Sequence, residues 1–512
     1  MSFEFAPIAK VGGLAEAVRG WVKAGVSLGY EVTVVMPSHG IHLNPSRGVP
    51  LRQLPARACG SRKGVDGRDY PYCIGFDEAW VEGARVILVK GLDEVTGRLL
   101  DTWPPYSNVE EKAALMARAL PALARLIGYP DLVHAHDWHA GLAGVVLKAV
   151  AEREGYALPL LFTIHLAGGK CFPWHYASSD WAGLGDGSHL VWRVARHVWE
   201  SYRGVWESVG GCVDAFAAVE ADALSTVSWG YLEEILQRYG EWLRGKSCVI
   251  YNATDWRVGE VAEAMRRTYG TDDRDALRHH LLSEALKHAS AGHISPDPPL
   301  FIVTGRLTPQ KGFDTALKAL DHYPEARLLL LGIPVGDKGY EAMIEGMVKE
   351  RAGRAALVRA KLPKHVFQGL HYAAAALLMP SRFEPFGISA IEAMAVGTPV
   401  IASYVGGLKD VVDDLRHHQR GTGLHVRPDD PVDLAHAMRS LAAVVHGWPP
   451  ASVPDPHLRA RYEREGPALT EGVRQWCVER VDKYFRPHAV AGMLKDCYEK
   501  ARVMAYYRAV TA

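Results

Sequence analysis

Short apolar segments rich in Val, Ile and Leu alternate along the chain with longer segments of helical periodicity. In the first half, the segments that read as buried strands are 31–37, 85–91, 132–137, 160–165 and 223–228. Helical periodicity lies between them, at about 13–28, 109–127, 139–153 and 190–207. Strands that are apolar throughout and separated by helices are typical of parallel sheets covered on both faces.

The second half repeats this pattern, with strand-like segments at 249–253, 300–307, 327–332, 375–381 and 399–403. Two such series predict an α/β protein of two doubly wound, Rossmann-like domains facing a cleft. We place the domains at 1–246 and 247–485, followed by terminal helices at 486–512. One expectation conflicts with the sequence: a strand should precede the loop 9–13, but only 2–7 is available. Either this strand is very short, or the printed start lies inside a longer protein.

The composition excludes several classes of protein. Of 512 residues, 48% are hydrophobic and 23% charged, so disorder is not the main state. Lys plus Arg and Asp plus Glu both number 58, which argues against binding nucleic acid through bulk charge. No apolar run is long enough to span a membrane, and no signal peptide is evident. The seven dispersed cysteines form no C-x-x-C pair, so we expect reduced thiols in a cytoplasmic protein, without disulfides or zinc.

Candidate chemistry lies in loops that follow predicted strands, where doubly wound sheets bind ligands. Gly12 and Gly13, beside Lys10, allow a phosphate to approach backbone N–H groups at a helix start. Arg306 and Lys311 share a loop that suits a diphosphate. The alternatives are a plain glycine turn and a solvated pair of charges.

The segment 381–392, SRFEPFGISAIE, is the most specific stretch. It reads as a strand end, a loop with Glu384, and a helix that begins near Gly387 and Ile388 and carries Glu392. The first helical N–H groups are unpaired and favour an anion. The two carboxylates can then bind a sugar at one end and a ribose at the other. The alternative is that Glu384 caps the helix and Glu392 is a surface residue.

Histidines and tryptophans form two further groups. His134, His136 and His139 end one predicted strand; because alternate strand residues face opposite sides, we expect one of them to contact substrate and no metal site. Trp192, Trp199 and Trp206 recur at seven-residue spacing, which predicts one shared helix face used for packing. Trp174 and Trp181 lie in a loop and suit carbohydrate stacking better.

Together these motifs resemble the starch and glycogen synthases, which are retaining glycosyltransferases of the GT-B fold. The matching segments, in order, are 10–14, 134–139, 162–165, 226–228, 306–312, 380–392 and 406–408. The resemblance implies transfer of glucose from ADP-glucose or UDP-glucose to the non-reducing end of an α-1,4-glucan, without a cofactor or metal. It also implies that the terminal helices pack back on the N-terminal domain.

The resemblance assigns a role to each candidate residue. It implies that Arg306 and Lys311 neutralise the diphosphate, and that Glu384 and Glu392 bind the donor sugar and the ribose. His136 would contact the donor glucose. Lys10, Gly12, Gly13, Gly387 and Ile388 would bind the donor, and His165 and Trp174 the acceptor.

Three departures from the family pattern indicate a divergent, archaeal-type branch. Ser107-Asn108 replaces an Asp-Asn pair, 252–255 reads Asn-Ala-Thr-Asp instead of Asn-Gly-Ile-Asp, and the usual Asn after His165 is absent. The acceptor is therefore open: a trehalose- or sucrose-type disaccharide synthase is the main alternative. A sugar-nucleotide epimerase and a glucan-binding protein with an inactive site are weaker ones.

Overall fold

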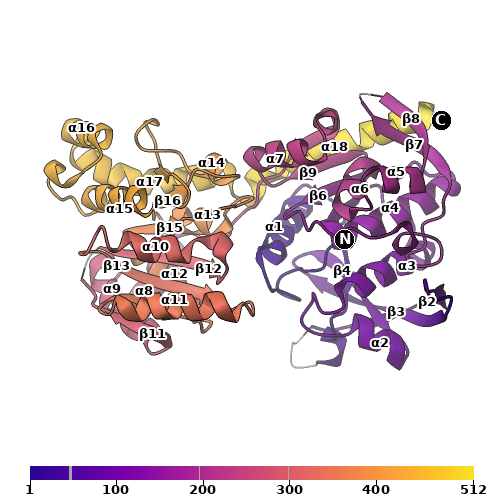
Figure 1. Cartoon of the computed structure of the whole chain (residues 1–512), viewed down its shortest axis with the longest axis horizontal. Helices are drawn as coiled ribbons and strands as arrows, with labels where there is room; N and C mark the ends of the chain where they lie inside the picture. Colours follow the sequence, from indigo (N-terminus) through magenta and orange to yellow (C-terminus); the bar gives the residue numbers. More distant parts are fainter. Residues whose placement is uncertain (45–48, 195, 298, 512) are drawn as a thin grey trace. The chain divides into compact units, whose positions relative to one another are not determined.

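The computed structural model describes residues 1–44, 49–194, 196–297 and 299–511. The chain forms two compact units, coloured in Figure 1 by position along the sequence. The first contains residues 1–227, 232–252 and 490–512, and the second contains residues 228–231 and 253–489. The sequence placed the two main divisions a few residues earlier, after 246 and 485. Across the described residues, no helix has both the length and the apolar character needed to cross a bilayer.

The first unit is built around parallel strands. β5 (Val133–His136), β6 (Leu160–Ile164), β9 (Ala223–Thr226) and β10 (Ser247–Val249) are parallel neighbours in the order β10-β9-β6-β5. β1 (Thr33–Pro37) pairs in parallel with β4 (Ala84–Gly91) in a separate sheet. The segment 249–253 was expected to open the second domain. This was wrong, because Val249 ends the last strand of the first unit and residues 250–253 form no strand.

The N-terminal residues connect these two sheets. The Ser2 N–H donates to the Val35 carbonyl oxygen of β1 at 3.1 Å. The Met1 amino group donates to the His134 carbonyl oxygen of β5 at 2.6 Å, and the His136 N–H donates to the Met1 carbonyl oxygen at 3.1 Å. Met1 and Ser2 thus occupy the position of a first strand between β1 and β5, although they form none.

The helices of this unit follow from the hydrophobic pattern. α1 (Gly13–Ser27), α3 (Val109–Ile127) and α4 (Trp138–Arg153) begin and end within a residue of the predicted bounds. α1 buries Leu14 and Val18 against Val34 and Met36 of β1 in one apolar cluster. α4 is buried along nearly its whole length, with apolar side chains on all sides, which explains its weak polar face.

Antiparallel elements were not predicted. β2 (Arg52–Lys63) and β3 (Asp69–Val81) extend the β1–β4 sheet. A hairpin of β7 (Ser188–Arg193) and β8 (Arg196–Ser201) replaces most of the helix expected at 190–207, and only α5 (Tyr202–Ser208) is helical there. The shared helix face of the three tryptophans is therefore wrong. Val and Trp are frequent in this segment, and β-branched and aromatic residues favour strands over a helix.

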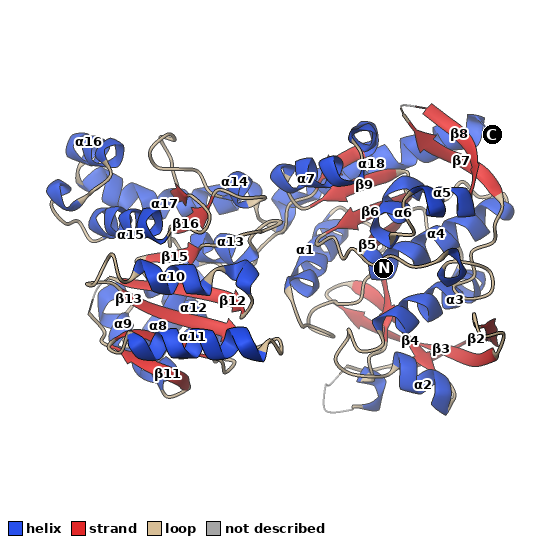
Figure 2. Ribbon diagram, in the orientation of Figure 1, coloured by secondary structure: helices blue, strands red, loops and turns tan. Residues whose placement is uncertain are grey.

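The second unit has one seven-stranded sheet in the order β11-β14-β13-β12-β15-β16-β17. Its strands are β11 (Ala289–Ile294), β12 (Leu300–Arg306), β13 (Arg327–Ile333), β14 (Arg354–Val358), β15 (Ala376–Met379), β16 (Val400–Ser403) and β17 (Gly423–Val426). All are parallel except the edge strand β11. Helices lie in front of and behind these strands (Figure 2). Phe301, Leu330 and Leu378 in the central strands are almost completely buried.

The C-terminal segment contains two long helices. α17 (Pro467–Tyr484) belongs to the second unit, where its Val473 joins the apolar core. α18 (Pro487–Thr511) belongs to the first unit from residue 490 onward. Its Arg508 Nε donates to Asp222 at 2.9 Å, and the Lys500 ammonium group donates to the Ser247 carbonyl oxygen at 2.7 Å.

Three disulfides correct the expectation of reduced thiols. They join Cys59 to Cys73, Cys171 to Cys212, and Cys248 to Cys497, and among the cysteines that the structure describes only Cys477, which is buried, is free. The partners are 14, 41 and 249 residues apart. The first pair faces across the β2–β3 ladder, and the third joins β10 to α18. Strand register and helix docking create these pairs, so the spacing of cysteines along the sequence could not reveal them.

Candidate functional site

The strand order in the sheet of the second unit reverses between β12 and β15. From β12 the chain moves outward through β13 and β14, and then it returns to pair β15 with the other side of β12. Ligands of open α/β sheets bind at the carboxyl ends of the strands beside such a reversal. The loops with Arg306 and Lys311 and with Glu384 leave these two strands, so the topology supports the candidate site.

Lys311 and Glu384 are in direct contact. The Lys311 ammonium group lies 2.5 Å from Glu384 Oε2, with about a tenth of the Glu384 side chain exposed. The Lys311 side chain passes along the backbone of Gly305, because a Cβ atom placed there would lie 3.6 Å from three of its methylene carbons. Gly312, at a φ of 65°, lies so close to Pro380 that an added Cβ would be 2.0 Å from its carbonyl oxygen. Glycine at 312 therefore allows the two loops to touch.

The two arginines of this region differ. The Arg306 guanidinium, at the end of β12, is partly exposed and makes no hydrogen bond or ion pair with any residue that the structure describes. The Arg382 guanidinium donates to Asp314 at 2.9 Å and to Asp429 at 2.9 Å. Arg382 therefore holds the loop in place, and Arg306 is available to a ligand. Arg382 could not be selected from the sequence, since nothing along the chain indicates its distant partners.

The helix α13 (Ile388–Ala395) begins directly after this loop. Its N-cap, Gly387, has a φ of 102° and supplies no side-chain acceptor. Among the described residues, nothing accepts a hydrogen bond from the N–H groups of Gly387, Ile388 or Ser389. This helix start thus offers three N–H donors to an anion. Glu392 is half-buried in the second turn of the helix.

A second glycine loop contacts the backbone of Glu384 and Pro385. The Gly407 N–H, just before α14 (Leu408–Val411), donates to the Glu384 carbonyl oxygen at 2.9 Å. A Cβ atom at 407 would lie 2.2 Å from the Pro385 carbonyl oxygen. The Ser228 hydroxyl donates to that same carbonyl at 2.6 Å. These contacts fix the backbone on either side of Pro385.

In the first unit, the loop with Lys10 is held by a residue outside the predicted site, Glu4. Glu4 Oε2 accepts hydrogen bonds from the N–H groups of Val11 at 2.5 Å and Gly12 at 2.9 Å. The expectation that the Gly12 N–H faces a phosphate is therefore corrected, because that donor already has an acceptor. The exposed Lys10 ammonium group forms an ion pair with Glu16 at 2.5 Å. The sequence signal that could have identified this contact is Glu4 itself, a carboxylate residue six positions before Lys10.

His136 and His139 of the 134–139 motif are buried and His134 is partly buried, and a lowered pKa keeps all three neutral. Burial is the largest cause that lowers the pKa of His136 well below its usual value, and burial lowers that of His165 to about 3. His136 Nδ1 and His165 Nε2 are 3.0 Å apart, which suits one neutral ring donating to another. Asp137 accepts from the His165 N–H at 2.7 Å and so holds the two segments together. The described residues contain no group of three or more His, Cys, Asp or Glu side chains arranged to hold a metal ion.

The other candidates of this unit are more dispersed. The rings of His136 and His165 both contact Trp21, at centroid distances of 5.5 and 4.9 Å. His139 stacks on Phe3 instead, at 4.5 Å. Trp174 lies apart from this histidine cluster, in the 3₁₀ turn η3 (Trp174–Tyr176), where its ring meets that of Trp206 edge to face at 6.2 Å.

Comparison with known proteins adds independent evidence. Residues 1–246 match the family described as the starch synthase catalytic domain, and residues 287–443 match glycosyl transferases group 1. A glycogen synthase of Acidiphilium cryptum is 28% identical over 499 residues, which cover 91% of this chain and 94% of that protein. One of Bordetella petrii is 28% identical over 474 residues, covering 84% and 82%.

Two solved structures share the fold. The catalytic domain of starch synthase IV from Arabidopsis thaliana, bound to ADP and acarbose, is similar with a TM-score of 0.72, 20% identity and coverage of 98% of both chains. A sucrose-phosphate synthase from Thermosynechococcus elongatus has a TM-score of 0.57 and 22% identity, with coverage of 96% of this chain and 94% of that one. At these identities the likeness concerns the fold alone.

The two Rossmann-like units and the matched families define a glycosyltransferase of the GT-B fold. Within this class, the chain is a hexosyltransferase of the glycogen and starch synthase type. The family resemblance of the sequence motifs is thereby confirmed.

Proposed function

We propose that this protein extends an α-1,4-glucan. It transfers glucose from ADP-glucose or UDP-glucose to the non-reducing end of the glucan, and the anomeric configuration is retained. The observation that carries the proposal is the arrangement beside the β12–β15 reversal. There, two neighbouring strands end in loops that carry three features. These are the unpaired Arg306 guanidinium, the Lys311–Glu384 pair and the three free N–H groups at the start of α13.

These groups suit the charge changes of glucosyl transfer. Breaking the bond between the sugar and the diphosphate develops negative charge on the leaving group and positive charge on the sugar. Fixed cations and N–H dipoles stabilise the leaving group without having to reorganise. Arg306, Lys311 and the N–H groups of α13 perform this role in the proposal.

The carboxylates have a second role. Glu384 binds hydroxyl groups of the donor glucose and keeps the Lys311 ammonium group in place, and Glu392 binds the ribose. His136, which is neutral, donates a hydrogen bond to the donor sugar and places no second charge near the developing cation. Lys10 and Gly13 contribute on the donor side, and His165 contributes on the acceptor side.

The test uses radiolabelled ADP-glucose and UDP-glucose, each with and without glycogen. The proposal is supported if label enters precipitable polymer and a glucosidase specific for α-1,4 linkages releases it. The nucleotide sugar that gives the higher rate shows whether the enzyme prefers adenine or uracil in its donor. Label in a disaccharide instead would support a trehalose- or sucrose-type synthase. A changed sugar nucleotide would support an epimerase, and an intact donor would indicate a glucan-binding protein.

We also propose that the protein works in the cytoplasm, where nucleotide sugars are available. The argument from reduced cysteines no longer supports this, because six of the seven are paired. Disulfides inside cells are a feature of some hyperthermophiles, which fits the divergent, archaeal-type sequence. Cell fractionation with an antibody against the full chain tests this proposal.

A further inference from the structure

Asp214, in the first turn of α6 (Val213–Glu220), belongs to none of the sequence motifs and is almost completely buried. Its Oδ2 accepts hydrogen bonds from the N–H groups of Gly168 at 2.7 Å and Gly169 at 3.2 Å. Both glycines lie in the loop 165–170, which follows β6 and contains no helix or strand. A single carboxylate oxygen thus binds two successive N–H groups in the middle of this loop.

The start of the same loop is held by Asp137, which directly follows His136. Its Oδ1 accepts hydrogen bonds from the N–H groups of His165 at 2.7 Å and Leu166 at 3.1 Å. The Asp137 backbone has a φ of 59°, which is costly for a residue other than glycine. Its own N–H donates to the Thr163 carbonyl oxygen of β6 at 2.8 Å. These contacts keep a strained residue, and therefore His136 next to it, in one position.

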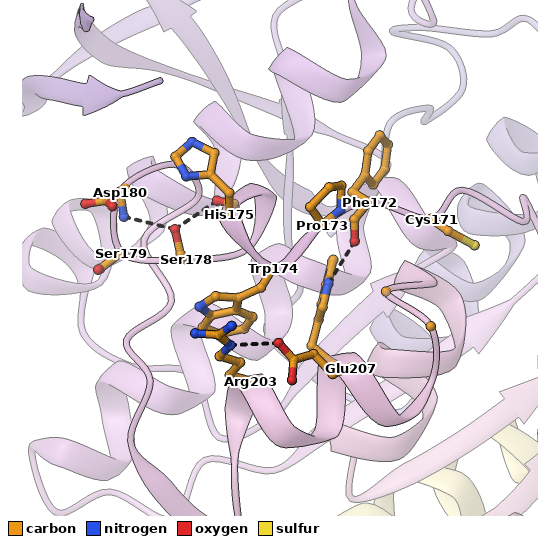
Figure 3. A pocket seen from close by; sticks show the side chains of 13 residues that line it. Cys171, Phe172, Pro173, Trp174, His175, Ser178, Ser179, Asp180, Arg203 and Glu207 are labelled. Carbon is orange, nitrogen blue, oxygen red and sulfur yellow. Dashed lines mark hydrogen bonds and ion pairs between the residues drawn. The ribbon is translucent and has the colours of Figure 1, made fainter. Parts of the chain in front are cut away.

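The far end of the loop is fixed to the start of α6. Cys171 forms a disulfide with Cys212, the N-cap of this helix. In the next residue, Phe172, the N–H donates to the Gly211 carbonyl oxygen at 3.0 Å, and the carbonyl oxygen accepts from the indole N–H of Trp206 at 2.9 Å (Figure 3). The loop is thus attached at both ends, and the α6 carboxylate supports its middle.

Burying two carboxylates close together is unfavourable. Burial raises the pKa of Asp214 to about 6. Burial also raises the pKa of Asp137 well above its usual value, and the charge of Asp214 raises it further. An apolar side chain of similar volume would avoid this cost, but it accepts no hydrogen bond. The contacts to the loop therefore explain why carboxylates occupy these two positions.

We propose that Asp214 is a positioning residue for glucosyl transfer, which acts through the loop 165–170 on the contact between His136 and His165. The inference rests on the proposed function, in which these two rings lie on the donor and the acceptor side. Nδ1 of the first ring and Nε2 of the second are 3.0 Å apart, so a small shift of the loop would separate them. Asp214 itself touches no substrate in this role.

The test is a double-mutant cycle that compares kcat with glycogen and the preferred nucleotide sugar. Asp214→Leu removes the acceptor at similar volume, and it should lower kcat about tenfold or more, because displaced groups are costly. Asp214→Asn keeps a carbonyl oxygen for the two N–H groups, so kcat should stay within about twofold of the native value. In a His165→Ala background, Asp214→Leu should lower kcat by less than about twofold further, because the group on which it acts is already absent. A role limited to folding would give the full loss in both backgrounds.

Asp93→Ala is the matched control. Asp93, also in the first unit, accepts from the Thr96 N–H at 2.8 Å at the start of α2 (Glu94–Leu100), outside this loop. Its kcat should be native. Hydrogen exchange, measured by mass spectrometry on peptides that cover 166–170, reports on the loop without any reaction. Exchange there should be about tenfold faster in Asp214→Leu and native in Asp214→Asn and the control. If Asp214→Leu does not fold, Asp214→Ala takes its place in both measurements.

Three results would overturn the inference alone. They are native exchange of the loop in Asp214→Leu, additive losses of kcat with His165→Ala, and a loss in Asp214→Asn as large as in Asp214→Leu. In each case the native protein would still transfer glucose, so the proposed function would stand. A native protein that transfers no glucose would instead overturn the proposed function and, with it, the role of Asp214.

Discussion

The Lys311 ammonium group lies 2.5 Å from Glu384 Oε2, and the two residues follow strands that are direct neighbours in a parallel sheet. They are 73 residues apart in the sequence. The pair joins two loops at the point where the strand order of the sheet reverses. Removing either partner should therefore affect both the charge available to a leaving group and the position of the other partner.

Lys311→Ala and Glu384→Ala should each lower the rate of glucosyl transfer by about 100-fold or more, because a fixed charge at the reacting diphosphate or sugar is lost. Both variants should keep native circular dichroism. Lys349→Ala is a matched control, since Lys349 forms an ion pair with Glu345 at 3.1 Å on α11 (Lys338–Glu350). Native turnover in both Lys311→Ala and Glu384→Ala would refute the site assignment.

Gly407→Ala should disturb the same loop through the backbone. An added Cβ atom would lie 2.2 Å from the Pro385 carbonyl oxygen and 2.6 Å from Phe386 Cα, so the segment after Glu384 must shift. We expect transfer to fall by about tenfold or more, as small displacements of positioned groups are costly. Gly346→Ala on α11 is the control, because its Cβ would meet nothing within 4 Å. Equal activity in these two variants would mean that the loop tolerates the shift.

The sequence predicted the parallel framework because apolar strands and amphipathic helices carry strong local patterns. The loops with Lys311 and Glu384 were predicted for the same reason, since they follow such strands. The antiparallel strands β2 and β3 were missed, because their mixed polar composition resembles exposed loops. Contacts between distant segments, such as Arg382 with Asp429, leave no local signal and could not be predicted.

The role of Glu4 is a related case. A buried carboxylate near the start of the chain reads as an anomaly until its hydrogen bonds to Val11 and Gly12 are seen. The glycine motif correctly marked a tight backbone approach. It did not reveal that this unit already supplies a negative acceptor to the loop.

The disulfides predict a definite thiol count. The chain has seven cysteines, and Cys477 alone is free, so denaturation without reductant should expose one reactive thiol per chain. Reduction should raise the count to seven. Values near seven without reductant would show that the three bonds do not form in the expressed protein.

The Cys248–Cys497 disulfide should stabilise the first unit. It joins residues 249 apart in the sequence and links α18 to the last strand of the sheet. Such long-range cross-links restrict the unfolded chain, so the double variant Cys248→Ser, Cys497→Ser should lose about 2–5 kcal/mol of unfolding free energy. Urea denaturation of the oxidised native protein and the variant measures this difference. Reductant should lower the stability of the native protein toward that of the variant, and an unchanged midpoint in both comparisons would contradict the prediction.

Buried histidines should make the first unit sensitive to acid. Burial lowers the pKa of His139 to about 3, from an unfolded value near 6.5, and its Nδ1 has no partner among the described residues. The unfolded chain therefore binds a proton between these two values that the folded chain does not. The contribution of the neutral His139 to stability is fully present above pH 6.5 and falls as the pH decreases, by about 1.4 kcal/mol per pH unit for one histidine.

Asp214, whose pKa burial raises to about 6, acts in the opposite sense, so the experiment must isolate the effect of His139. The difference in unfolding free energy between the native protein and His139→Gln, measured at pH 7.5 and at pH 5, should shift in favour of the variant by about 2 kcal/mol. A constant difference between the two pH values would show that His139 is not held neutral by its surroundings.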